Sequence, residues 1–371
     1  MDVLTDMSRD ITPTRPFSDE ESESLKLHNG FEALVRSEQV SWQMSYRLLR
    51  PLGSGGQGVV MLADRINHHG LPFRVALKFY RPSVYPDQTL YRRDMERVAR
   101  VAMQLARTQQ DHLVDVFNVV EANEVQIVLM EWIDGIDLAH LLRPHMLDRV
   151  RAQVDDDHWE HVNDVVVTHA KSQLRLQPGI ASAILRDCLV GVASLHREGI
   201  VHADLKPANV MIKRTGTCKL IDFGSAFHAN DLPFRSTWTP RYAAVEVLQG
   251  KMPTPASDLA SLGYIFVEML SGAYPFPDAE TNSEFVDAKR ALPANLRSML
   301  PEDVAGNERL VHLIQRLIDP DPARRFESAE VAELGPDGTS EFQKQLVKGN
   351  LSSEYANEIR LLLEKMAHPQ P

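Results

Sequence analysis

The segment Val201–Met211, with the sequence VHADLKPANVM, constrains this chain more than any other part of it. One short loop carries an Asp, a Lys two residues later and an Asn five residues later. Phosphoryl transfer needs a carboxylate that orients the attacking hydroxyl and accepts its proton, a cation beside the migrating group, and an oxygen ligand for magnesium. Asp204, Lys206 and Asn209 fit these three roles. The structural alternative is a polar turn between a helix and a hairpin.

A second acidic motif, Ile221–Gly224 (IDFG), ends a short apolar strand and places Asp222 18 positions after Asp204. An Asp that leaves a buried strand needs a partner, and Mg²⁺ is a strong one. We also expect Phe223 to pack against His202 and so to link the two loops. A simple strand-ending turn is the alternative, but the order of the two motifs favours a phosphotransferase.

Glycines precede these motifs in a G-x-G-x-x-G-x-V pattern made by Gly53, Gly55, Gly58 and Val60. A dinucleotide-binding fingerprint has the same glycine spacing, but a helix must follow it. Here the following residues have the character of a strand, so we expect a hairpin whose backbone N–H groups can approach phosphate oxygens. An ordinary flexible hairpin is the alternative.

Lys78 ends the motif Val75–Lys78 (VALK), inside an apolar strand. A lysine in such a place is unexpected unless its ammonium group meets an anion, and the α- and β-phosphates of ATP would supply one. The alternative is a side chain that runs along the sheet and reaches water.

Composition narrows the function classes. The 371 residues carry a formal net charge of −11, the opposite of the basic surplus of nucleic-acid binders. Only two cysteines occur, Cys188 and Cys218, which argues against a disulfide framework and for a reducing compartment. No apolar run approaches the roughly 18 residues needed to span a bilayer, and the N-terminus lacks signal-peptide features. We therefore expect a cytoplasmic protein with no nucleic-acid partner and no membrane span.

Apolar patterning predicts a small, mostly antiparallel sheet with one helix, followed by a mainly helical region. The expected strands are Tyr46–Leu52, Gly58–Ile66, Phe73–Tyr80, Val114–Glu121 and Val125–Glu131, and the expected helices are Leu90–Arg107, Ala181–Glu198, Ser257–Leu270 and Glu308–Ile318.

Three segments fall outside this pattern. Residues 1–45 are expected to be a partly disordered extension, in which Ser18 and Glu21 suit a capping box. The acidic and histidine-rich stretch 144–178 matches no metal-ligand spacing and suggests a solvated insertion. The tail 336–371 carries an apolar stripe at helical spacing, and this helix is expected to pack on its own domain. The stripe comprises Tyr355, Ile359, Leu362 and Met366.

Taken in order, the motifs resemble those of the eukaryotic-type (Hanks-type) Ser/Thr protein kinase family over most of the chain. The resemblance implies an α+β, two-lobed domain over 46–335, with an N-lobe at 46–133 and a C-lobe at 134–335. It also implies ATP and Mg²⁺ (or Mn²⁺) as cofactors and a protein substrate with a Ser/Thr acceptor. The oligomeric state stays open.

The same resemblance implies residue roles. Met130 resembles the gatekeeper of the adenine pocket, and the backbone of Glu131 and Ile133 resembles the hinge that bonds adenine. Val60, Ala76 and Met211 would sandwich the ring. Further on, Asp258 would hold the catalytic loop, and Glu246 would pair with Arg325.

Three positions depart from the family pattern. Ala203 stands where an Arg normally grips a phosphorylated activation segment, so we expect activity that does not depend strongly on such phosphorylation. Val245 replaces a proline. The acidic partner of Lys78 is ambiguous: Glu96 is the best candidate by chemistry and position, and Asp94 is the second.

Two rival functions remain at this stage. A pseudokinase scaffold or ATP sensor usually lacks the equivalents of Lys78, Asp204 or Asp222, and all three are present. A small-molecule phosphotransferase uses a similar set of Asp, Asn and Asp residues, but normally lacks the Ala244–Glu246 and Arg325 regions.

Overall fold

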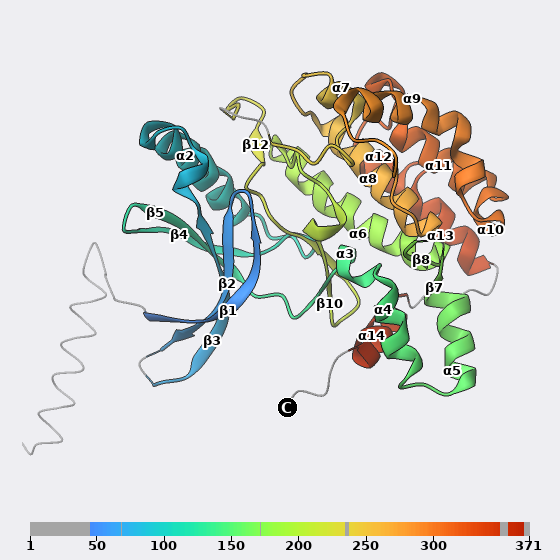
Figure 1. Cartoon of the computed structure of the whole chain (residues 1–371), viewed down its shortest axis with the longest axis horizontal. Helices are drawn as coiled ribbons and strands as arrows, with labels where there is room; N and C mark the ends of the chain where they lie inside the picture. The colour runs from blue at the N-terminus through green and yellow to red at the C-terminus, as the bar shows by residue number, and fades with distance from the viewer. Residues whose placement is uncertain (1–44, 68, 171, 234–236, 349–354, 367–371) are drawn as a thin grey trace, which may run out of the picture.

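The computed structural model describes residues 45–366, apart from 68, 171, 234–236 and 349–354. These residues form two lobes, a twisted sheet with one long helix and a larger helical body (Figure 1). This is the α+β, two-lobed fold that the sequence predicts. The N-terminal extension, with Ser18 and Glu21, lies outside the described residues.

The N-lobe is built on a five-stranded antiparallel sheet in the order β1-β2-β3-β5-β4. Its strands are β1 (Ser45–Gly55), β2 (Gly58–Ile66), β3 (Pro72–Tyr80), β4 (Val116–Ala122) and β5 (Val125–Glu131). Helix α2 (Gln88–Leu105) begins at Asp87, whose side chain accepts a hydrogen bond from the Leu90 backbone N–H. A separate cluster covers the face of the sheet opposite Lys78, and it comprises Ala63, Val75, Leu77, Ile127 and Leu129.

The C-lobe is organised around two buried helices, α6 (Pro178–Arg197) and α8 (Pro255–Ser271). A capping box of Thr254 and Ser257 starts α8, which is buried along most of its length. The surrounding helices are α3 (Leu138–Leu141), α7 (Val245–Leu248), α9 (Asn282–Met299), α10 (Glu302–Ala305), α11 (Glu308–Ile318), α12 (Ala329–Leu334) and α13 (Thr339–Lys348).

Short strands between the lobes carry the loops that matter for function. Strands β6 (Gly135–Asp137), β10 (Val210–Lys213) and β11 (Cys218–Leu220) form one small sheet. A second pairing joins β9 (Ile200–Val201) to β12 (Phe227–His228). The loop before β10 therefore carries Asp204, and the loop after β11 carries Asp222.

Among the described residues, one helix is long and apolar enough to cross a membrane by composition alone. This helix is α6, and most of it is buried inside the C-lobe. Burial of this kind is typical of the core helix of a globular domain.

The described residues of the stretch 144–178, for which the sequence suggests a solvated insertion, contain regular secondary structure. It comprises α4 (Pro144–Arg151), α5 (Asp156–His161), a π-helical turn (Val162–Val166), β7 (Val167–His169) and β8 (Leu174–Leu176). The acidic and histidine residues lie on its outer surface, whereas Leu147, Val150 and Val167 are fully buried. The many charged residues of this stretch therefore drew attention away from the apolar residues that form its buried inner face.

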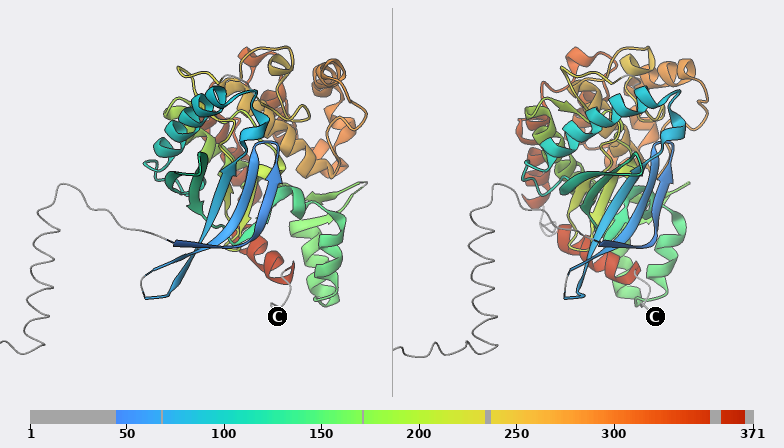
Figure 2. Two further views of the ribbon diagram at one scale, coloured as in Figure 1. Left: turned by 60° about the vertical axis from the view of Figure 1, so that its left-hand side comes forward. Right: turned by 90° about the vertical axis from the view of Figure 1, so that its left-hand side faces the viewer.

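Helix α14 (Tyr355–Met366) packs against α4, α6 and the π-helical turn. Figure 2 shows this helix, in red, close to the green helices α4 and α5. All four residues of its predicted stripe are buried.

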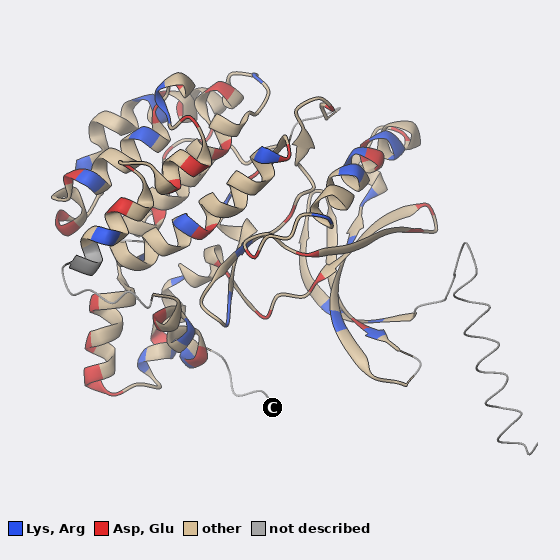
Figure 3. Cartoon of the chain, turned by 180° about the vertical axis from the view of Figure 1, so that it is seen from behind, with Lys and Arg blue, Asp and Glu red and all other residues tan. Residues whose placement is uncertain are grey.

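Charged residues of both signs are interspersed over the two lobes in the view of Figure 3.

Candidate active site

Three polar side chains surround Asp204: Lys206 and Asn209 come from the same loop before β10, and Thr239 comes from a later segment. Lys206 Nζ donates a hydrogen bond to Asp204 Oδ2 over 2.6 Å. The Thr239 hydroxyl donates to Asp204 Oδ1 over 2.8 Å, and Asn209 Nδ2 donates to the Asp204 carbonyl over 2.8 Å. The Asp204 carboxylate is therefore oriented by a cation and a hydroxyl, and the Asn209 Oδ1 oxygen is left for another partner.

A buried carboxylate fixes the backbone of this loop. Asp258, at the start of α8, is 1% exposed and accepts hydrogen bonds from the backbone N–H groups of His202 (2.9 Å) and Ala203 (3.0 Å). Ala203 has a φ of 65°, a left-handed conformation that costs free energy for a residue with a side chain. The two bonds from Asp258 hold the chain in that conformation just before Asp204.

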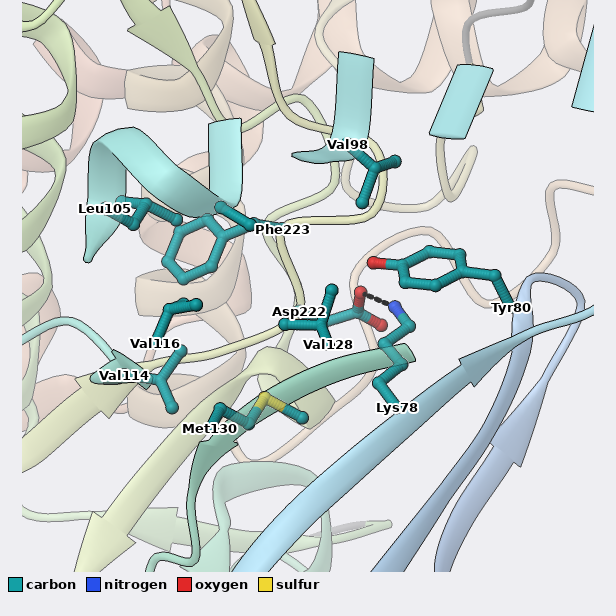
Figure 4. A pocket seen from close by; sticks show the side chains of 11 residues that line it. Lys78, Tyr80, Val98, Leu105, Val114, Val116, Val128, Met130, Asp222 and Phe223 are labelled. Carbon is teal, nitrogen blue, oxygen red and sulfur yellow. Dashed lines mark hydrogen bonds and ion pairs between the residues drawn. The ribbon is translucent and has the colours of Figure 1, made fainter. Parts of the chain in front are cut away.

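The loop after β11 presents Asp222 to the same region. Figure 4 shows Lys78 and Asp222 in direct contact. Burial alone would raise the pKa of Asp222, but the Lys78 ammonium lowers it to about 2. Burial likewise opposes the charge on Lys78, yet the neighbouring Tyr80 and Asp222 oxygens raise its pKa. The two groups therefore form a charged pair at neutral pH.

Backbone and ring contacts join the two loops. The Ile221 N–H donates to the Asn209 carbonyl over 3.0 Å. The ring of His202 lies 5.2 Å from that of Phe223, centroid to centroid, which is the packing expected from the sequence. Asp204 and Asp222 therefore belong to one connected arrangement.

Strand register places the adenine-pocket residues on the same face of the sheet as Lys78. Val60 pairs with Lys78 across β2 and β3, and Ala76 pairs with Met130 across β3 and β5. Because alternate residues of a strand point to one face, these side chains share a surface. Met211 lies in β10, on the C-lobe side.

Glu131 and Ile133 follow as the chain passes between the lobes. The Glu131 side chain contacts Lys219 and accepts a hydrogen bond from the Asp115 N–H over 2.7 Å. These two partners hold the Glu131 carboxylate away from the pocket. Any contact of Glu131 with adenine would therefore be made by its backbone.

The glycine hairpin contains two different kinds of glycine. A Cβ atom on Gly58 would lie 1.9 Å from the Phe79 carbonyl oxygen, so packing against β3 requires glycine there. A Cβ atom on Gly53 or Gly55 would meet nothing within 4 Å. Protein packing therefore does not explain these two glycines, and the open space beside them suits a ligand.

Gln57, at the tip of this hairpin, is a site residue that sequence reasoning missed. Its Oε1 accepts a hydrogen bond from Lys78 Nζ over 3.2 Å, and its Nε2 donates to Ser225 Oγ over 2.9 Å. The hairpin is thereby tied to both β3 and the Asp222 loop. The glycine pattern gave no signal for this contact, because Gln57 occupies a position at which the pattern accepts any amino acid.

The expected pair between Glu96 and Lys78 is not formed, which corrects the sequence expectation. The Glu96 side chain is 70% exposed and lies 4.0 Å from Arg100. The buried face of α2 instead includes Met95, Val98 and Ala102. Each helical residue turns the side-chain direction by about 100°, and this turn places Glu96 outside the buried face that Met95 and Val98 share.

The second candidate, Asp94, is also turned away from Lys78. It accepts hydrogen bonds from Arg97 Nε and the Tyr85 hydroxyl, both over 2.7 Å. Val98, four residues further along the helix, lines the same pocket as Lys78 and Phe223 (Figure 4).

Arg97, next to Val98, is a second residue that sequence reasoning missed. It is 4% exposed and donates hydrogen bonds to the carbonyl oxygens of Gly224 (2.8 Å) and Ala226. A long charged side chain beside an apolar stripe is normally solvent-exposed, so its burial was not visible in the sequence.

The donor set suits a nucleotide held with magnesium. The two candidate metal ligands offer hard oxygens, the Asp222 carboxylate and Asn209 Oδ1, which Mg²⁺ prefers. Two protein ligands are few, but Mg²⁺ commonly takes its other oxygens from phosphates and water. Lys78 would meet the phosphates, and the open side of the glycine hairpin would leave them room.

A family comparison agrees with this geometry. Residues 46–334 match the model of the protein kinase domain, so the chain belongs to the protein kinase family.

Bacterial Ser/Thr kinases are among its relatives. The chain is 30% identical over 292 residues to the Ser/Thr-protein kinase drp72 of Corynebacterium efficiens, covering 76% of this chain and 48% of the relative. It is 30% identical over 289 residues to PknD of Mycobacterium tuberculosis, covering 76% and 38%. It is 27% identical over 292 residues to PrkC of Bacillus subtilis, covering 78% and 39%. The matched region thus spans less than half the length of each relative.

Proposed function

We propose that this chain is an ATP-dependent Ser/Thr protein kinase that transfers the γ-phosphoryl group of ATP to a protein hydroxyl. The observation that carries the proposal is a continuous set of contacts between the lobes. Lys78 pairs with Asp222, the Asp222 loop bonds the carbonyl of Asn209, and Asn209 bonds the carbonyl of Asp204. The names of the bacterial relatives support the same class of reaction.

Each polar side chain has a distinct task in this proposal. Asp204 orients the acceptor hydroxyl and receives its proton on the carboxylate, which Lys206 and Thr239 hold in place. Lys78 positions the α- and β-phosphates, and Lys206 offsets charge on the γ-phosphate. Asp222 and Asn209 would hold Mg²⁺, which neutralises charge on the phosphates. Most of the rate enhancement then comes from positioning and charge stabilisation.

The proposal includes a regulatory feature. Ala203 supplies no cation to hold a phosphate on the activation segment. Its backbone is instead fixed by Asp258, which needs no modification to do so. The catalytic loop is therefore ordered without phosphorylation, and we infer activity of the non-RD type.

The test is phosphate transfer from radiolabelled ATP, with Mg²⁺ or Mn²⁺, to a general protein substrate. The full chain is compared with Asp204→Asn, which keeps the size of the side chain but not the base. We expect Asp204→Asn to lower kcat by about 10² to 10⁴-fold while leaving ATP affinity unchanged. Equal rates in the two proteins would rule out Asp204 as the base.

One observation favours a second candidate, a nucleotide-binding scaffold without transferase activity. Neither Asp94 nor Glu96 of α2 pairs with Lys78, whereas active kinases pair this lysine with an acidic residue of the helix. A scaffold would bind a fluorescent ATP analogue and show no transfer above the Asp204→Asn background. Transfer well above that background excludes it.

A small-molecule phosphotransferase is separated from a protein kinase by its acceptor. Glu246 and Arg325 form a buried bidentate pair, at 2.7 and 2.8 Å, of the kind the protein kinases use. Mass-spectrometric mapping of autophosphorylated Ser or Thr residues would favour the protein kinase. Both cysteines are free and buried, which is compatible with the cytoplasmic location that we propose.

A further inference from the structure

Helix α9 carries a lysine that is completely buried. Lys289 is 0% exposed, and its ammonium group donates hydrogen bonds to three backbone carbonyls. The acceptors are Pro240 (3.1 Å), Arg241 (2.8 Å) and Ala243 (2.8 Å). All three N–H bonds of the ammonium group are thus used on one short segment of the chain.

Three aromatic rings complete the surroundings of this cation. The Lys289 nitrogen lies 4.1 Å from the ring centroid of Tyr264, 4.7 Å from that of Phe276 and 5.6 Å from that of Phe285. Ring faces attract cations at such distances. A buried ammonium is costly unless its environment compensates for lost water. Here the carbonyls and rings compensate in part, and burial still lowers the pKa of Lys289 well below its ordinary value.

The segment that Lys289 holds leads directly to the catalytic base. Thr239 immediately precedes it, and the Thr239 hydroxyl donates to Asp204 Oδ1 over 2.8 Å. On the far side, the Tyr242 hydroxyl donates to Glu268 Oε2 over 2.6 Å, and Arg241 donates to the Pro275 carbonyl over 3.1 Å. One end of the segment therefore touches the base, while its remainder is fastened to buried groups.

We propose that Lys289 is a positioning residue that fixes the segment Thr239–Ala243, and through it the Asp204 carboxylate, for the arriving Ser/Thr substrate. The proposal rests on the proposed kinase function. A simple space-filling role would need neither three carbonyl acceptors nor a charge. With the ammonium removed, three carbonyls that are partly or fully buried lose their donor, so the segment moves to find other partners.

The experiment compares the full chain with Lys289→Met, which keeps the length of the side chain without its charge. Lys344→Met, on the exposed part of α13, is the matched control. Initial rates are measured over a range of protein-substrate and ATP concentrations. Affinity for a fluorescent ATP analogue is measured separately, and hydrogen exchange is followed over residues 237–247.

For Lys289→Met we expect kcat/KM for the protein substrate to fall by about 10 to 100-fold, because catalysis is sensitive to small displacements. ATP affinity should stay within about twofold, since the nucleotide contacts lie elsewhere. Exchange should become faster over 237–247 and remain unchanged in α2 and β3. Kinetics and exchange equal to those of Lys344→Met would overturn the proposal. A loss in ATP affinity as large as the fall in kcat/KM for the protein substrate would overturn it too.

Failure of the kinase function is distinguishable from failure of this inference. If the unmodified chain transfers no phosphate, the kinase proposal fails, and the exchange measurement alone decides the role of Lys289. If Lys289→Met does not fold, Phe285→Leu replaces it. This change removes one of the three aromatic rings around Lys289 and keeps the ammonium group. The same selective loss, smaller in size, is then expected, and unchanged kinetics and exchange would overturn the inference.

Discussion

Arg97 of α2 donates a hydrogen bond to the carbonyl oxygen of Gly224 over 2.8 Å. The helix is therefore tied to the Asp222 loop through a cation and a backbone carbonyl. Lys78, which would otherwise pair with an acidic residue of this helix, pairs with Asp222. The position of α2 and the position of the candidate metal ligand are thus coupled without a carboxylate on the helix.

Replacing Arg97 by Met should destabilise the protein. The change removes the partner of Asp94 and the donor to two buried carbonyls, so we expect the free energy of unfolding to fall by about 3 kcal/mol. Urea denaturation measures this loss, and the same variant should show a lower kcat.

Glu96→Gln is the control for this prediction, because it alters an exposed residue one position away. Its effect on unfolding should be within about 0.5 kcal/mol. Equal stability of the two variants would show that the buried contacts of Arg97 carry no weight.

Stability at acidic pH should report the Lys78–Asp222 pair. The pKa of Asp222 is lowered to about 2 in the folded chain, against about 3.9 when unfolded. Its stabilising contribution is therefore complete above about pH 5 and is lost as the pH falls towards 2. Urea denaturation of the nucleotide-free protein at pH 5, 4 and 3 measures this dependence.

In Lys78→Met the sign of this contribution should reverse. Without the ammonium, burial becomes the main influence and raises the pKa of Asp222. Protonation then favours the folded state, and less stability is lost on acidification than in the unmodified chain. Parallel pH profiles for the two proteins would contradict a direct pair.

Activity should survive loss of the activation-segment hydroxyls. Ser236 lies outside the described residues, and the Thr237 hydroxyl contacts Ser225 Oγ over 2.7 Å. Because Ala203 supplies no counter-charge for a phosphate, we expect Ser236→Ala, Thr237→Ala to retain transfer within about threefold. Collapse of the rate to the Asp204→Asn background would refute independence from phosphorylation.

Neighbouring leucines of α14 should respond very differently to truncation. Leu362 is 3% exposed and Leu361 is 40% exposed. Leu362→Ala should lower the free energy of unfolding by about 2 to 4 kcal/mol, because it leaves a cavity. Leu361→Ala should change it by less than about 0.5 kcal/mol. Thermal or urea denaturation checks the difference, and equal losses would mean that the docked face is assigned wrongly.

The sequence predicted the fold class and the family because ordered motifs and strand alternation are local signals. Two expected strands, Gly58–Ile66 and Val125–Glu131, have the same bounds in the structure. Asp204, Lys206 and Asn209 are brought together because they share one loop, and so their spacing alone nearly determines their geometry.

The partner of Lys78 could not be predicted in the same way. It depends on the rotation of α2 about its axis, and a rotation by one residue exchanges Glu96 for Arg97. The hydrogen bonds of Gln57 and Lys289 join residues up to 180 and 49 positions apart in the sequence. No local pattern encodes such contacts, since they arise only when the lobes and helices are assembled.

The β10–β11 turn and α14 approach each other very closely. A Cβ atom on Gly216 would lie 1.8 Å from the Ala356 carbonyl oxygen, whereas the recognisable family region stops at residue 334. The cooperative unit is accordingly longer than its homology suggests. A shortened chain that ended at residue 334 would expose the apolar surface that α14 covers on α4 and α6, and such a surface promotes aggregation.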